Sequence, residues 1–164
     1  MDQFKALGLY LQVALISGVL ALVISFFDAY IRVSGGGQSQ NVTNAWDGWG
    51  TFAMLLLIAS IAVVAAKAFA SASLPAQVPF TLVALALAVV SALILVIKPF
   101  TVDVPSFVGD VSVGPGWSGW VLLVLVVVYV ASVVLLFRES GEKLPQVNNN
   151  NKGGTTPPNT PPAA

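Results

Sequence analysis

The sequence predicts an all-α membrane protein, a four-transmembrane-helix bundle with two outer loops that have the pattern of short β-hairpins. The first observation is composition: the 164 residues are 57% apolar and 9% charged, whereas soluble domains carry about 25% charged residues. The second is the presence of four uncharged stretches, 6–27, 48–66, 68–97 and 111–137. A helix crosses a bilayer core with about 20 mostly apolar residues. The sequence therefore argues against a soluble enzyme, a nucleic-acid binder and a disordered chain.

The first span is expected at about 7–27. Its apolar stretch is longer than the roughly 7–15 residues found in a signal peptide. It also ends at Phe26-Phe27-Asp28 rather than at a small-residue cleavage site. We therefore expect a retained helix.

The second span is expected at about 48–70. Asn44 precedes it as a candidate N-cap, and Asp47 follows in what would be the first turn, where a carboxylate complements the helix dipole. Lys67 falls in the last turn, where a lysine extends its ammonium to the membrane interface.

The third and fourth spans are expected at about 78–97 and 117–137. Pro79 suits the first turn of the third helix, because a missing N–H costs nothing there. Lys98-Pro99 ends that helix, and the turn residues 114–116 precede the fourth.

The chain divides into a transmembrane domain, 1–138, and a polar tail, 139–164. The tail is rich in Asn and Pro and has little to bury, so we expect a disordered cytoplasmic segment. A Pro-rich segment that binds a partner is the alternative.

Basic residues are unevenly spread over the two sides that four spans would create. Five lie on the side of the termini and two in the long loops: Lys5, Lys67, Arg138, Lys143 and Lys152 against Arg32 and Lys98. Because basic residues favour the cytoplasmic side, we expect a multi-pass protein of the inner (plasma) membrane with both termini cytoplasmic.

The two outer loops alternate apolar and polar residues. Residues 31–34 and 40–43 flank a Gly-rich turn, and residues 101–104 and 110–113 flank a second turn. Each pair is typical of a β-hairpin, and the two hairpins could join in one small sheet.

All four tryptophans fall at the outer ends of the second and fourth spans: Trp46, Trp49, Trp117 and Trp120. They fit an interfacial belt, since an indole ring prefers the headgroup level, or a cluster that contacts a lipid or another subunit. Both pairs read Trp-x-Gly-Trp, which indicates either an internal duplication or shared interfacial chemistry.

Small residues recur every four positions on three of the spans. They are Ser17, Ala21 and Ser25 on the first, Ala62, Ala66 and Ala70 on the second, and Ala84, Ala88 and Ala92 on the third. This spacing lets helix backbones approach closely. It predicts a compact bundle, with a homo-oligomer or a larger membrane complex as possible assemblies.

Chemistry-bearing residues are scarce. The chain has no Cys and no His, and no expected span carries a charge at its centre. The outer carboxylates Asp28, Asp47, Asp103 and Asp110 could hold a hard cation, but solvation, capping or pairing with Arg32 and Lys98 is the main expectation. We therefore expect no catalytic residue, no metal, no cofactor and no nucleic-acid partner, with membrane lipid as the surrounding partner.

Three features carry a resemblance. They are Phe26-Phe27-Asp28-Ala29-Tyr30 at the end of the first helix, the Gly-rich segment 34–37, and Asn44-Ala45-Trp46 before the second. Over about residues 7–138 the chain resembles uncharacterised four-helix integral membrane proteins of actinobacteria and related high-GC bacteria. The resemblance implies topology and supplies no catalytic residue.

The functional expectation is a non-enzymatic structural or accessory subunit of the bacterial cell envelope. The alternative is an oligomeric pore or permease subunit, such as a holin-like or small-solute channel.

Overall fold

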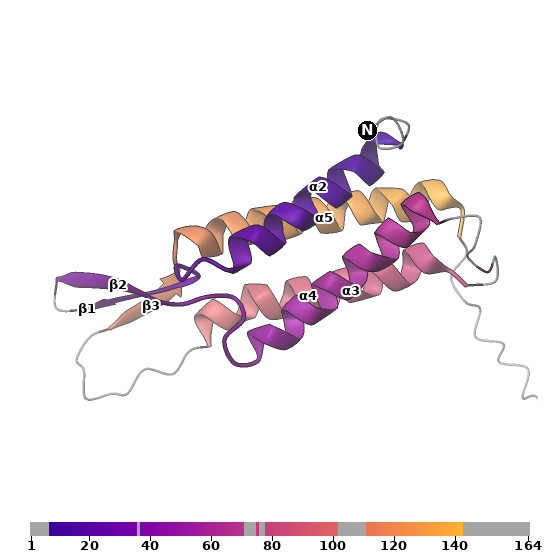
Figure 1. Ribbon diagram of the computed structural model, residues 1–164. Coiled ribbons are helices and arrows are strands. Elements are labelled where there is room, and N and C mark those ends of the chain that lie inside the picture. The colour runs from indigo at the N-terminus through magenta and orange to yellow at the C-terminus, as the bar shows by residue number, and fades with distance from the viewer. Residues whose placement is uncertain (1–6, 36, 71–74, 76–77, 102–110, 143–164) are drawn as a thin grey trace, which may run out of the picture.

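Four α-helices and one three-stranded sheet make up the computed structural model (Figure 1), which describes residues 7–35, 37–70, 75, 78–101 and 111–142. The helices are α2 (Leu9–Ser25), α3 (Gly50–Phe69), α4 (Phe80–Ile97) with the 3₁₀ turn η2 (Lys98–Phe100), and α5 (Trp117–Ser140). The strands are β1 (Ile31–Gly35), β2 (Gln38–Thr43) and β3 (Ser112–Pro115).

Three of the helices described are long and apolar enough to cross a membrane. They are α3, α4 with its 3₁₀ turn, and α5, with mean hydropathies of 2.4, 3.0 and 3.0. Helix α2 is apolar as well but has 17 residues, about 26 Å at 1.5 Å per residue.

Each helix buries a narrow stripe and exposes apolar side chains elsewhere. On α5 the buried stripe runs through Leu122, Val126, Tyr129 and Val133, at the spacing of one helix face. Val124, on the opposite side, is 60% exposed. A helix that is apolar all round is typical of a membrane span. Helix α5 forms although it is rich in β-branched residues, which favour strands in water.

The helices form two adjacent pairs. Figure 1 shows α2 lying along α5 and α3 along α4, and the pairs meet where α4 packs against α5 and α2 against α3. We call the end of the bundle that carries the sheet the sheet end; here α2 and α4 end and α3 and α5 begin.

The sheet has the order β2-β1-β3 and all its pairs are antiparallel. Strands β1 and β2 form the first predicted hairpin. Strand β3 joins the same sheet by pairing Val113 with Val33, which confirms that both loops contribute to one sheet. The other arm of the second predicted hairpin was 101–104; Thr101 is not in a strand, and 102–104 lie outside the described residues.

Two helix boundaries at the sheet end differ from expectation. Helix α2 ends at Ser25, and Phe26 and Phe27 lie in turns, because the Ala45 N–H bonds to the Ser25 carbonyl and draws the chain toward the sheet. Helix α3 begins at Gly50. The Asn44 side chain caps the Trp46 N–H, 3.0 Å away, in a preceding turn rather than capping the helix.

At the other end, α5 continues to Ser140, past the expected end at 137. Gly141 then adopts φ +64°, the left-handed conformation that commonly terminates a helix.

The two Trp-x-Gly-Trp motifs have different structural roles. Gly48 lies in the turn before α3 with φ +53°, a conformation that favours glycine. Gly119 lies within α5, where a Cβ would collide with the Tyr30 carbonyl. Their different positions favour shared interfacial chemistry over duplication.

The small-residue stripes of α2 and α3 also differ. Ser17, Ala21 and Ser25 are all buried on α2. On α3, Ala62 is exposed and Ala66 half-buried, so this stripe does not line the interior. The interior positions of α3 include Ala53, Leu57, Ser60 and Val64. Hydropathy could not have shown which face packs inward, because every face of α3 is apolar.

Candidate functional site

Two of the four tryptophans, Trp46 and Trp117, contact the two phenylalanines that follow α2. Trp46 stacks on Phe26 with ring centroids 5.2 Å apart, and its indole N–H donates to Ser25 Oγ at 2.9 Å. Trp117 meets Phe27 edge-on at 5.4 Å. The other two, Trp49 and Trp120, are exposed, and neither touches another ring in the described part of the chain.

Lys98 is buried at the sheet end. It is 4% exposed, and its ammonium donates to the carbonyls of Asp47 at 2.6 Å, Ala45 at 3.3 Å and Asn44 at 3.5 Å. It also lies 5.3 Å from the centroid of the Tyr30 ring, a cation–π distance. Lys98 therefore fastens the segment before α3 to the end of α4.

Tyr30 fixes the same region from the other side. Its hydroxyl donates to the Leu95 carbonyl of α4 at 2.5 Å, and burial raises the pKa of this phenol above its ordinary value. Tyr30 thus remains a neutral hydrogen-bond donor.

The outer carboxylates do not assemble into a metal centre in the described residues. Asp28 accepts a hydrogen bond from the Asn44 amide, and Asp47 accepts one from Thr43 Oγ1, both at 2.9 Å. No group of three or more Asp or Glu side chains converges in the described ranges. Asp103 and Asp110 lie outside them.

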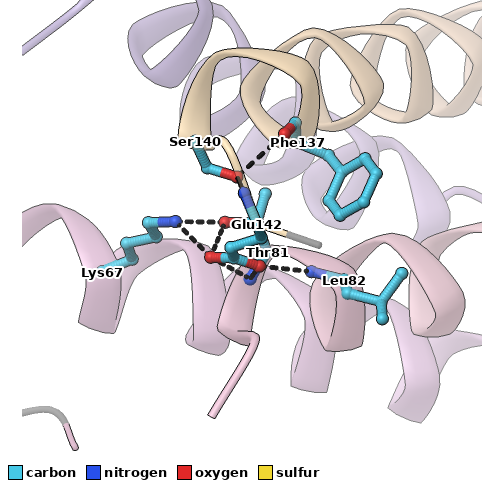
Figure 2. Close-up of polar contacts among 6 residues, drawn as sticks. All are labelled: Lys67, Thr81, Leu82, Phe137, Ser140 and Glu142. Atoms are coloured by element: carbon cyan, nitrogen blue, oxygen red, sulfur yellow. Dashed lines mark hydrogen bonds and ion pairs between the residues drawn. The ribbon is translucent and has the colours of Figure 1, made fainter. Parts of the chain in front are cut away.

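The opposite end of the bundle carries a cluster that the sequence did not predict. Figure 2 shows the Glu142 carboxylate facing Lys67 of α3 and the first turn of α4. Its Oε1 accepts from Lys67 Nζ at 2.7 Å and from Thr81 Oγ1 at 2.8 Å. Its Oε2 accepts from the Thr81 and Leu82 amides at 3.1 and 3.2 Å. We call Lys67, Thr81 and Glu142 the acid clamp.

In the acid clamp, Glu142 acts as an N-cap for α4 that is supplied by the segment after α5. The first N–H groups of a helix lack partners within the helix, and a side-chain oxygen at the N-cap usually satisfies them. The N-cap of α4 is Pro79, whose side chain makes no such bond. The Glu142 carboxylate bonds to the second and third helical residues instead, and its charge complements the helix dipole.

The end of α5 directs Glu142 to this place. Ser140 Oγ donates to the Phe137 carbonyl at 2.8 Å and accepts the Glu142 N–H at 3.3 Å. Gly141, with φ +64°, turns the chain between them. The sequence shows Ser-Gly-Glu only as part of a polar tail, so it offers a helix stop but no sign of the distant partner.

Electrostatics at the clamp favour the carboxylate form. Burial alone raises the pKa of Glu142. The hydrogen bonds from Lys67, Thr81 and the Leu82 amide outweigh that effect and lower the pKa below its ordinary 4.5. Lys67 was expected simply to reach the interface; its side chain is 37% exposed, and it is also ion-paired.

A pocket of about 350 Å³ lies beside the clamp and is lined from all four helices. Its apolar wall consists of Leu11, Val63, Val64, Phe80, Ala84 and Leu136. Its polar lining is Lys67, Thr81, Glu139 and Ser140. The volume is in the range of small-molecule sites, about 300–1,000 Å³.

The middle of the bundle holds a small hydroxyl network. Ser60 Oγ donates to the Ala84 carbonyl at 2.7 Å and lies 2.7 Å from the Tyr129 hydroxyl. Ser91 Oγ donates to the Ala53 carbonyl at 2.8 Å. These bonds join α3 to α4 and α5, and the hydroxyl groups that form them have their hydrogen-bond partners inside the bundle.

Comparison of the chain with protein-family models, with curated proteins and with solved structures finds no match. The resemblance to four-helix actinobacterial proteins stays a prediction.

Proposed function

We propose that this chain is a non-enzymatic, four-span membrane protein that serves as a structural or accessory subunit of the bacterial cell envelope. In this proposal the termini are cytoplasmic, and the sheet end faces outward.

The position of α2 supports the fourth span. Its last residue, Ser25, bonds to Trp46 and Ala45 just before α3. Near its start, Leu11 lines the same pocket as Lys67 and Thr81. Helix α2 thus runs between the same two levels as the longer helices, although it is shorter.

The hydrogen bonding inside the bundle supports the accessory role. Among the described residues, no buried side-chain nitrogen or oxygen lacks a hydrogen-bond partner. Hydroxyls in the middle of the bundle bond to backbone carbonyls, as Ser60 and Ser91 do. Groups held in this way do not line a water-filled path, which favours a packed support over a monomeric channel.

The test is solute flux. Liposomes containing the purified chain should release an entrapped fluorophore, potassium or protons no faster than protein-free liposomes. A pull-down from native membranes should recover a stoichiometric membrane partner. Robust flux that is abolished by Ala21→Leu, together with a pull-down that recovers only this chain, would contradict the accessory role and favour the oligomeric pore.

A further inference from the structure

We propose that the pocket beside the acid clamp binds one phospholipid that carries a phosphoethanolamine headgroup. The proposal rests on membrane insertion as argued above, and on nothing else in the proposed function.

The wall and the position of the pocket favour a lipid. Six apolar side chains line it, and the lining residue Thr81, in the first turn of α4, places it at the end of an apolar helix. Lipid headgroups lie at this level of a bilayer. About 350 Å³ corresponds to roughly a dozen water volumes of 30 Å³, enough for a headgroup and the first methylenes of a chain. The remaining chain length would lie in the surrounding bilayer.

The polar lining favours a phosphate next to an amine. The ammonium of Lys67 has three N–H groups, and it donates to two acceptors among the described residues, Glu142 and Thr81. The third N–H is available to a phosphate oxygen, and the apolar wall reduces competition from water.

The charged residues at the pocket favour a lipid headgroup that carries an amine. Lys67 is paired with Glu142, and Glu139 is the lining residue whose charge has no ion-pair partner among the described residues. An ethanolamine ammonium can both pair with Glu139 and donate hydrogen bonds to it. A choline headgroup has no N–H to donate, and a glycerol headgroup has no positive charge.

Native mass spectrometry of the full chain tests this. The chain is released from nanodiscs that contain equal amounts of phosphatidylethanolamine, phosphatidylcholine and phosphatidylglycerol with identical acyl chains. We expect one retained phosphatidylethanolamine, preferred about tenfold over phosphatidylcholine, as for one charge-assisted hydrogen bond.

Two variants separate the pocket from general lipid adhesion. Glu139→Gln should abolish the preference, and Arg138→Gln, an exposed neighbour outside the lining, should keep it. Val63→Phe should fill the pocket and release the lipid while the helical circular dichroism spectrum stays unchanged. Should Val63→Phe fail to fold, Glu139→Gln still decides.

Water-soluble phosphoethanolamine separates a lipid from a free headgroup. It should not displace the bound lipid at millimolar concentration, since it cannot cover the apolar wall. Displacement by it, equal retention of the three lipids, or a preference that survives Glu139→Gln would overturn the proposal. None of these results bears on flux or on the number of spans, so the proposed function fails or stands separately.

Discussion

Two lysines, one at each end of the bundle, are held in opposite ways. At the sheet end, Lys98 is buried and donates to three backbone carbonyls. At the opposite end, Lys67 is half-exposed and pairs with the carboxylate of Glu142. Carbonyls are fixed by the fold, whereas a carboxylate titrates and changes rotamer. The sheet end is therefore the rigid end, and the clamp end is the one that conditions can alter.

The largest expected effect comes from crowding the Lys98 contact. A Cβ at Gly50 would collide with the Ala45 carbonyl and the Lys98 ammonium, both held in place. Gly50→Ala should therefore destabilise the chain by about 2–3 kcal/mol in thermal unfolding followed by circular dichroism. The control is Gly114→Ala at the same end, where a Cβ meets nothing within 4 Å. Equal effects of the two variants would contradict a rigid sheet end.

Removing the buried ammonium should have the next largest effect. Lys98→Met keeps most of the side-chain volume but leaves the Asp47 and Ala45 carbonyls without this donor. We expect a loss of about 2 kcal/mol in the same assay. The matched change at the other end, Lys67→Met, should cost less, because Lys67 is partly solvated. A larger loss of stability for Lys67→Met than for Lys98→Met would contradict the proposed difference between the two ends.

The clamp should show a smaller effect that depends on pH. Glu142→Gln should cost about 1 kcal/mol at pH 7, since it weakens a partly exposed ion pair and a helix cap. The folded pKa of Glu142 lies below its ordinary 4.5. The stabilisation is therefore present above the unfolded pKa and is lost as the pH falls through the folded pKa.

Melting curves between pH 7 and pH 3 measure this. The difference in melting temperature between wild type and Glu142→Gln should shrink as the pH falls below 4.5, the ordinary pKa of a glutamate side chain. The control is Glu139→Gln, at an exposed neighbour with no clamp bond, which should leave the stability at pH 7 nearly unchanged. A constant difference for Glu142→Gln would show that its carboxylate charge contributes nothing to the clamp.

The smallest effect on stability is expected for a substitution that lies away from both ends of the bundle. Ala62 is exposed on α3, four residues from Ala66, so this stripe could meet a helix of another subunit. Ala62→Leu should alter stability by less than about 0.5 kcal/mol. It should nevertheless reduce crosslinking to neighbouring subunits in native membranes. Unchanged crosslinking would mean that this face contacts lipid alone.

The sequence predicts features that depend on neighbouring residues, and it does not predict contacts between distant ones. Uncharged stretches marked the helices, and alternation at 31–34 and 40–43 marked the β1–β2 hairpin, because both signals are local. Lys98 next to Pro99 looks like any helix end. Its acceptors lie more than 50 residues earlier in the chain, beyond any local pattern.

Glu142 was missed for a related reason. It follows a helix stop and precedes a polar, Pro-rich segment, so the sequence alone places it in the tail. The missing cap was itself a usable signal, since Pro79 cannot satisfy the first amides of α4. The missing cap predicts that a hydrogen-bond acceptor from another part of the chain meets these amides, but it does not show which carboxylate provides it.

Membrane topology tests the central claim most directly, and the absence of cysteine makes the measurement clean. Gln3→Cys, Gln40→Cys and Ala164→Cys would each be treated in intact spheroplasts with a thiol reagent that cannot cross membranes. Four spans with cytoplasmic termini predict that only Gln40→Cys, on exposed β2, is labelled before permeabilisation. Labelling of Gln3→Cys together with Gln40→Cys would place both ends of α2 on one side and contradict the four-span account.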